Sequence, residues 1–124
     1  MSFKEILQEI VEGCGGGMGA ALMGMDGMPI EQVVSDRGSE VPLLEDISVA
    51  GVEFQRVLEE IHKASDGIEA GSMEETVLIF ARTALVFRPV DEETFLVVAV
   101  APDGNLGKAR YLIRKNLYAI RQEL

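Results

Sequence analysis

The sequence has 124 residues, a formal net charge of −10 and 48% hydrophobic residues. This favours one folded domain over residues 1–124 and disfavours nucleic acids and anionic membranes as partners. A single cysteine, Cys14, excludes an internal disulfide and suits a reducing compartment. Because the first residues carry acids and lack the continuous apolar segment of a signal peptide, we expect a cytoplasmic protein.

The first element that the sequence predicts is a helix over residues 2–12. Ser2 followed by Glu5 matches the capping box, in which each side chain bonds to the other residue's backbone N–H. Apolar residues then recur at helical spacing from Phe3 to Val11, and Gly13 is a suitable end.

A β-hairpin is predicted over residues 18–34. Asp26-Gly27 lies between two apolar segments, and glycine tolerates the positive φ of a tight turn. Pro29 cannot donate to a strand ladder, so the second strand should be an edge strand. The methionines here are best explained as core residues.

A second helix is predicted over residues 43–65, after a polar loop over 35–42. Its apolar stripe is wider than one contact with a sheet requires. Gly51 in its middle should cost about 1 kcal/mol relative to alanine. We therefore expect its small size to allow the close approach of a second helix.

Three short strands follow, at Thr76–Ala81, Ala84–Val90 and Phe95–Ala101, with polar turns between them. Apolar residues point to both faces, so both faces of the sheet need a cover. A last helix is predicted over residues 106–123 after the turn at Pro102-Asp103-Gly104. The order α-β-β-α-β-β-β-α predicts an α/β (α+β) fold, with one five-stranded antiparallel sheet and helices on both faces.

The sequence offers little catalytic chemistry, and we expect no cofactor, no metal and no enzymatic activity of the chain's own. Residues 15–20 fit G-x-G-x-x-A, but a helix precedes them and a strand follows, the reverse of a dinucleotide site. Cys14 and His62 could form a nucleophilic pair, although a helix-end thiol and a surface histidine are the simpler interpretation. Asp91-Glu92-Glu93 could bind a cation, but a solvated hairpin turn is the preferred interpretation, because the spaced acids and central glycine of a calcium loop are absent.

Positive charge is concentrated at the C-terminal end. Residues 1–105 carry 20 acids and 6 bases, whereas residues 106–124 carry 1 acid and 5 bases. The bases could form a docking strip or the solvated face of a helix, and the second interpretation is preferred. They are Lys108, Arg110, Arg114, Lys115 and Arg121.

Two segments resemble the Roadblock family of small dimeric domains. One is the strand and Asp-Gly turn at residues 19–29, and the other is the apolar strand at 95–100 leading to Asn105-Leu106-Gly107-Lys108. The order of elements matches this family over essentially the whole chain. Among its members the chain resembles most the bacterial stand-alone proteins of the MglB type.

The resemblance implies a homodimer, in which the third strands of two copies pair into one continuous sheet and the middle helices pack together. An apolar edge strand and a wide helical stripe agree with this. The implied interface residues are Thr76, Val77, Leu78, Ile79, Phe80, Ala81, Gly51, Phe54 and Leu58.

The resemblance also implies a partner, a small Ras-like GTPase of the MglA type in bacterial polarity or motility signalling. Such a dimer binds the GTPase and can stimulate its GTP hydrolysis. The polar positions implied for this contact are Glu53, Gln55, Arg56, Glu59, Glu60 and Lys63. Two alternatives remain open: a dimeric scaffold for a non-GTPase partner, and a small-molecule sensor.

Overall fold

The computed structural model describes residues 2–39 and 47–124, apart from the side chain of Ser39. Its elements are α1 (Phe3–Gly13), β1 (Gly17–Gly24), β2 (Pro29–Val34), α2 (Asp36–Ser39), α3 (Ile47–Gly67), β3 (Thr76–Ile79), β4 (Ala84–Pro89), β5 (Thr94–Val100) and α4 (Leu106–Glu123). Apart from the short α2, this is the order that the sequence predicts.

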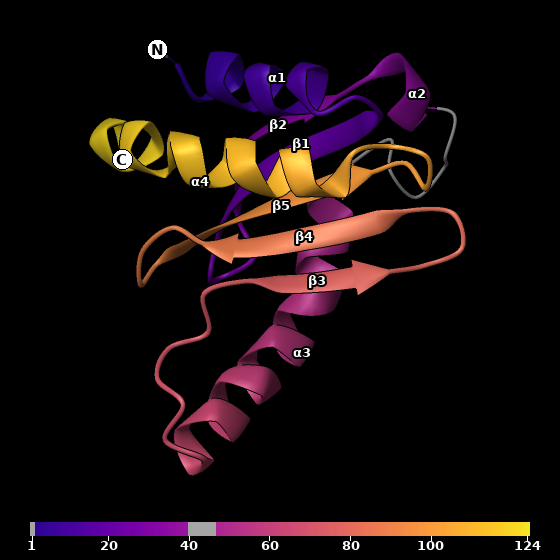
Figure 1. Ribbon diagram of the computed structural model, residues 1–124. Helices are drawn as coiled ribbons and strands as arrows, with labels where there is room; N and C mark the ends of the chain where they lie inside the picture. Colours follow the sequence, from indigo (N-terminus) through magenta and orange to yellow (C-terminus); the bar gives the residue numbers. More distant parts are fainter. Residues whose placement is uncertain (1, 40–46) are drawn as a thin grey trace.

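The five strands form one antiparallel sheet in the order β2-β1-β5-β4-β3 (Figure 1). The hairpin β1–β2 forms as expected, with Gly27 at a φ of 90° in its turn. Pro29 begins β2, which is an edge strand as predicted. β3 is the other edge, so its outer side has no neighbouring strand among the described residues.

Helices cover both faces of this sheet, which confirms the predicted fold class. α1 and α4 lie side by side on one face, over a core that includes Ile10, Val98 and Ile113. α3 lies on the other face, over Met23, Phe87 and Phe95. The capping box of α1 is present as predicted, with the Ser2 hydroxyl accepting from the backbone N–H of Glu5.

α3 covers its face only in part. Its buried residues, Ile47, Ser48 and Gly51, all lie in its first turns. In Figure 1 its C-terminal half extends past β3 and beyond the edge of the sheet. One side of β3 and much of α3 therefore remain open.

Three predicted boundaries need comment. The segment 35–42 was expected to be a loop, but residues 36–39 form α2, because the Ser35 hydroxyl accepts from the N–H of Gly38 as a cap. The predicted start of the middle helix, residues 43–46, lies outside the described residues, and this helix continues to Gly67. β3 ends at Ile79, two residues earlier than predicted.

Candidate functional site

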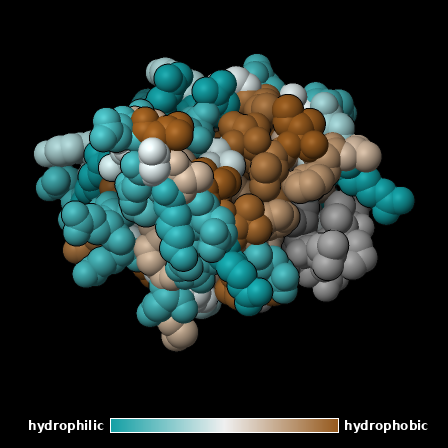
Figure 2. Space-filling model, turned by 90° about the horizontal axis from the view of Figure 1, so that it is seen from below, coloured by the Kyte–Doolittle hydropathy of each residue, from teal (hydrophilic) through white to brown (hydrophobic). Residues whose placement is uncertain are grey.

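The open surface of α3 and the edge of β3 form a candidate interaction surface. Ile79 is 73% exposed and Phe80 is 46% exposed at the end of β3, and Val57 on α3 is 47% exposed. Figure 2 views the molecule from the side where these elements lie, and hydrophobic residues form a continuous area there. Exposed apolar side chains gathered in this way mark an interaction site in a folded domain.

Aromatic contacts hold α3 against this edge. The ring of Phe54 on α3 lies 6.1 Å from the ring of Phe80 and 5.7 Å from that of Phe87 on β4. Phe87 in turn lies 6.5 Å from Phe95 on β5. Such pairs favour tilted rings at these separations, so the aromatic row places α3 next to the end of β3.

The structure places most of the predicted interface residues together. Thr76, Val77 and Leu78 are half-buried in β3, and Ile79 is exposed at its end. Phe80 and Ala81 do not continue the strand, because the N–H of Phe80 bonds to the carbonyl of Thr83 and closes the β3–β4 turn. Phe54 and Leu58 are partly buried against the core between the sheet and α3. Their role in a dimer stays a prediction.

Gly51 has a different use from the one expected. It is buried, and a Cβ on it would come within 3.2 Å of Cγ of Met23 on β1. Its small size therefore allows α3 to approach the chain's own sheet, and the expected contact of Gly51 with a second helix stays a prediction.

The six polar residues predicted to contact a partner divide into two groups. Gln55, Glu59 and Lys63 line a pocket beside α3. Glu53, Arg56 and Glu60 are exposed and do not line it. Lys63 Nζ lies 3.5 Å from Glu60 Oε1, so these two charges partly neutralise each other. The helix thus presents polar groups on both sides of its apolar stripe.

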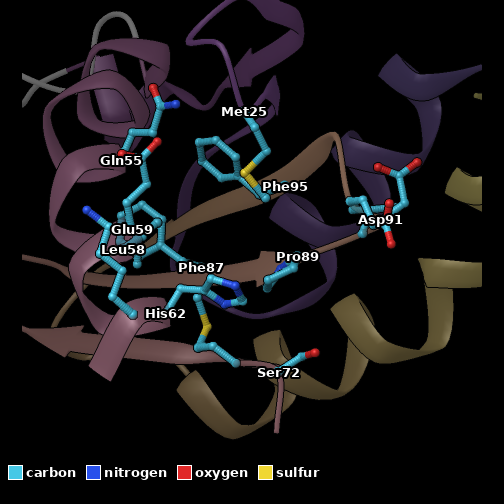
Figure 3. A pocket seen from close by; sticks show the side chains of 14 residues that line it. Met25, Gln55, Leu58, Glu59, His62, Ser72, Phe87, Pro89, Asp91 and Phe95 are labelled. Carbon is cyan, nitrogen blue, oxygen red and sulfur yellow. The ribbon is translucent and has the colours of Figure 1, made fainter. Parts of the chain in front are cut away.

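The pocket has a volume of about 700 Å³ and lies between α3, the segment before β3, and the β4–β5 hairpin. Figure 3 shows the side chains of Leu58 and His62 from α3 and of Phe87 and Phe95 from the sheet directed toward the same space. Its floor is apolar and its rim is polar. Sequence patterns missed this pocket, because its walls come from four segments far apart in the chain, Met25 after β1 being the fourth.

The rim of the pocket at the β4–β5 turn is held by Asp91. Its carboxylate accepts hydrogen bonds from the Thr94 hydroxyl and from the N–H groups of Glu93 and Thr94, at 2.7 to 2.8 Å. The Thr94 hydroxyl, foremost among these contacts, lowers the pKa of Asp91 below its usual value. Residues 91–93 are exposed and connect β4 to β5, in agreement with the solvated hairpin turn preferred from the sequence.

The two groups suggested for nucleophilic chemistry are far from each other. Cys14 is buried among α1, α4 and their face of the sheet, and burial raises the pKa of its thiol. His62 is exposed on α3 on the other face, where its Nε2 lies 3.9 Å from Asp66. Within residues 2–39 and 47–124, no three His, Cys, Asp or Glu side chains gather to hold a metal ion. No helix in this described part is long and apolar enough to cross a membrane.

The resemblance of this chain to known proteins is to solved structures. No family model and no curated protein matches its sequence. Among solved structures, MglC from Myxococcus xanthus is 31% identical over 100% of both chains, with a TM-score of 0.69. The gliding protein MglB from Thermus thermophilus is 17% identical over 97% of this chain and 86% of its own, with a TM-score of 0.81.

A Roadblock/LC7 domain from Streptomyces avermitilis is 13% identical over 98% of this chain and 97% of its own, with a TM-score of 0.79. The last two likenesses concern the fold. The 31% identity to MglC over the full length of both chains supports membership of the same family as well as the same fold. Together with the sheet order and the helices on both faces, it shows that this chain belongs to the Roadblock family and lies close to its MglB-like members.

Proposed function

We propose that this protein is a homodimeric regulator or adaptor that binds a small Ras-like GTPase. The homodimer is supported by one observation. At the edge of β3 that is unpaired in the described part of the chain, exposed apolar side chains continue onto the open side of α3. An unpaired apolar edge strand favours association with another strand. Pairing of two β3 strands about a two-fold axis would cover both copies of this surface.

Similarity to MglB supports both the self-association and the GTPase partner. An MglB structure is described as having a tetrameric arrangement, so a protein of this fold is seen to self-associate. The GTPase partner rests on the resemblance to MglB-type proteins, together with the mixed charges along the exposed side of α3. We assign Glu53, Arg56 and Glu60 to this contact first, because they remain accessible outside the pocket.

The dimer is tested by light scattering coupled to gel filtration. We expect the mass of two chains for the wild type, and a single folded chain at working concentration would overturn the proposal. The partner is tested with Ras-like GTPases of the same genome, each loaded with GDP or with a non-hydrolysable GTP analogue.

Co-elution in one nucleotide state supports the GTPase role, and faster phosphate release would add activation to binding. A matched pair of variants at Glu53 and Ile68 sharpens this test. Glu53→Arg lies on the proposed contact, whereas Ile68→Arg changes an exposed residue beyond the end of α3. A dimer that captures no GTPase in either nucleotide state would contradict the GTPase role and leave the scaffold as the function.

A further inference from the structure

A row of arginines lies along the seam between α4 and the strands β3 and β4. Arg110, Arg114 and Arg121 are spaced by four and seven residues, which places them on one side of a helix. Arg110 pairs with Glu75 just before β3, and Arg121 Nε donates to the carbonyl of Val90 at 2.7 Å. These two contacts turn the whole row toward β3 and β4.

The sheet adds a fourth guanidinium to this row. Arg88 lies two residues from Val86 and from Val90, so it shares their face of the sheet, and both valines belong to the core beneath α1 and α4. It therefore emerges on the same face as α4. Thr76 pairs with Phe87, so the register brings Arg88 beside Glu75. The Nε of Arg88 is buried and has no hydrogen-bond partner among the described residues.

Two described carboxylates are seen beside this cluster, Glu75 and Asp91. Glu75 pairs with Arg110, and Asp91 lies near enough to Arg121 for that guanidinium to help lower its pKa. A buried donor without a partner is costly unless something else accepts from it, so the seam has unused capacity for carboxylate oxygens.

Two exposed tyrosines stand next to the arginine row. Tyr111 is 53% exposed and Tyr118 is 72% exposed, and their spacing of seven residues puts them on one side of α4. A solvated helix face usually carries charged and small polar side chains, and two large exposed aromatic rings depart from that pattern. Tyrosine and arginine together are enriched in protein interfaces, where they supply much of the binding energy. This combination is unlike an ordinary wet helix face.

We propose that the seam formed by Arg88, Arg110, Arg114 and Arg121 binds an acidic segment of a partner protein, with Tyr111 and Tyr118 packing against it. Guanidinium groups bind carboxylates through paired hydrogen bonds. From Arg110 to Arg121 the helix rises about 16 Å, so an extended segment of about five residues would span the row.

The charge of the remaining chain favours a short segment over an extended anionic surface. Residues 1–105 carry 20 acids and 6 bases, which would repel a membrane or a nucleic acid. A short peptide within the seam is screened from these acids beyond about 10 Å at moderate salt. The proposal does not depend on the GTPase role, because the seam lies on the opposite face of the sheet from α3.

The test uses the full chain and a fluorescently labelled peptide of about eight residues, alternating glutamate and serine, long enough to span the seam. Anisotropy should report binding that weakens as salt rises from about 10 to about 100 mM, because the Debye length then falls from about 30 to about 10 Å. Arg114→Glu should weaken binding about tenfold or more, because it reverses a charge in the row. Arg88→Gln removes the guanidinium with the buried Nε, unpaired among the described residues, and it should also weaken binding of the peptide.

Arg82→Glu in the exposed β3–β4 turn is the matched control and should bind like the wild type. Thermal melts of the variants check that each is folded. No binding at any salt concentration between about 10 and about 100 mM would overturn the proposal, and so would an equal loss in Arg82→Glu and Arg114→Glu. Binding of phosphatidylserine vesicles or of single-stranded DNA in place of the peptide would overturn it in favour of those surfaces.

Discussion

The ring of Phe54 on α3 lies 6.1 Å from the ring of Phe80, which follows β3 directly. This contact joins α3, which lies on the face of the sheet opposite α1 and α4, to the end of the edge strand β3. The open surface of α3 therefore adjoins the edge of β3. A change at Phe54 should affect both the stability of the chain and the shape of this surface.

Phe54→Ala should lower the free energy of unfolding by about 2–4 kcal/mol, because it removes ring contacts with Phe80 and Phe87. Urea denaturation measures this. Val57→Ala, one turn further along α3 and 47% exposed, is the matched control and should cost less than about 1 kcal/mol. Equal losses in the two variants would mean that the aromatic row does not hold α3 in place.

Ile79→Lys should convert the proposed dimer into a monomer or an aggregate, because it places a charge on the exposed end of β3. Light scattering after gel filtration gives the mass. Ile30→Lys is the control, since Ile30 is also an exposed isoleucine but lies in β2 at the opposite edge of the sheet. If Ile79→Lys keeps the mass of two chains, the dimer does not use this edge.

Gly51→Leu should destabilise the fold by about 1–3 kcal/mol, since even a Cβ would come within 3.2 Å of Met23, which is fully buried. Gly67→Leu is the control at the end of the same helix, where a Cβ would meet no atom within 4 Å. Thermal or urea unfolding compares them. A loss of dimer mass at full stability in Gly51→Leu would instead support the expected contact of Gly51 with a partner helix.

Much of the fold follows from periodicity and turn chemistry. Ser2 and Glu5 define the start of α1, and Asp26-Gly27 defines the first hairpin, because each acts through neighbouring residues. The two apolar faces of β4 and β5 require covers, which identifies the layers. These signals are local, and the structure agrees with them.

Other features depend on contacts between distant residues. α2 forms because Ser35 caps it, while the same hydroxyl also donates to the carbonyls of Gly17 and Met18. The use of Gly51 depends on Met23, and the pocket joins α3 to the β4–β5 turn. Helical spacing shows that an element has an apolar side, but it does not show which neighbour occupies it.

Asp91→Asn should lower the melting temperature at pH 7 by removing the charge that Glu93 and Thr94 stabilise through hydrogen bonds. The folded pKa of Asp91 is lowered, so its stabilising effect is present above the unfolded pKa and is lost as the pH falls through the folded value. The melting temperatures of the wild type and of Asp91→Asn should therefore converge as the pH is lowered. Glu92→Gln, whose carboxylate makes no hydrogen bond among the described residues, should follow the wild type throughout.

Cys14 should react with a thiol reagent at neutral pH at least about a hundredfold more slowly in the folded protein than in urea, because reaction requires an exposed thiolate. Its side chain is fully buried, its Sγ lies 3.6 Å from the carbonyl of Val11, and burial raises the pKa of the thiol. Absorbance after addition of a chromogenic disulfide follows the reaction. A Cys14→Ser, Ser72→Cys double variant provides a thiol at an exposed position and should react at once. Fast reaction of native Cys14 would show that the end of α1 opens readily from the sheet.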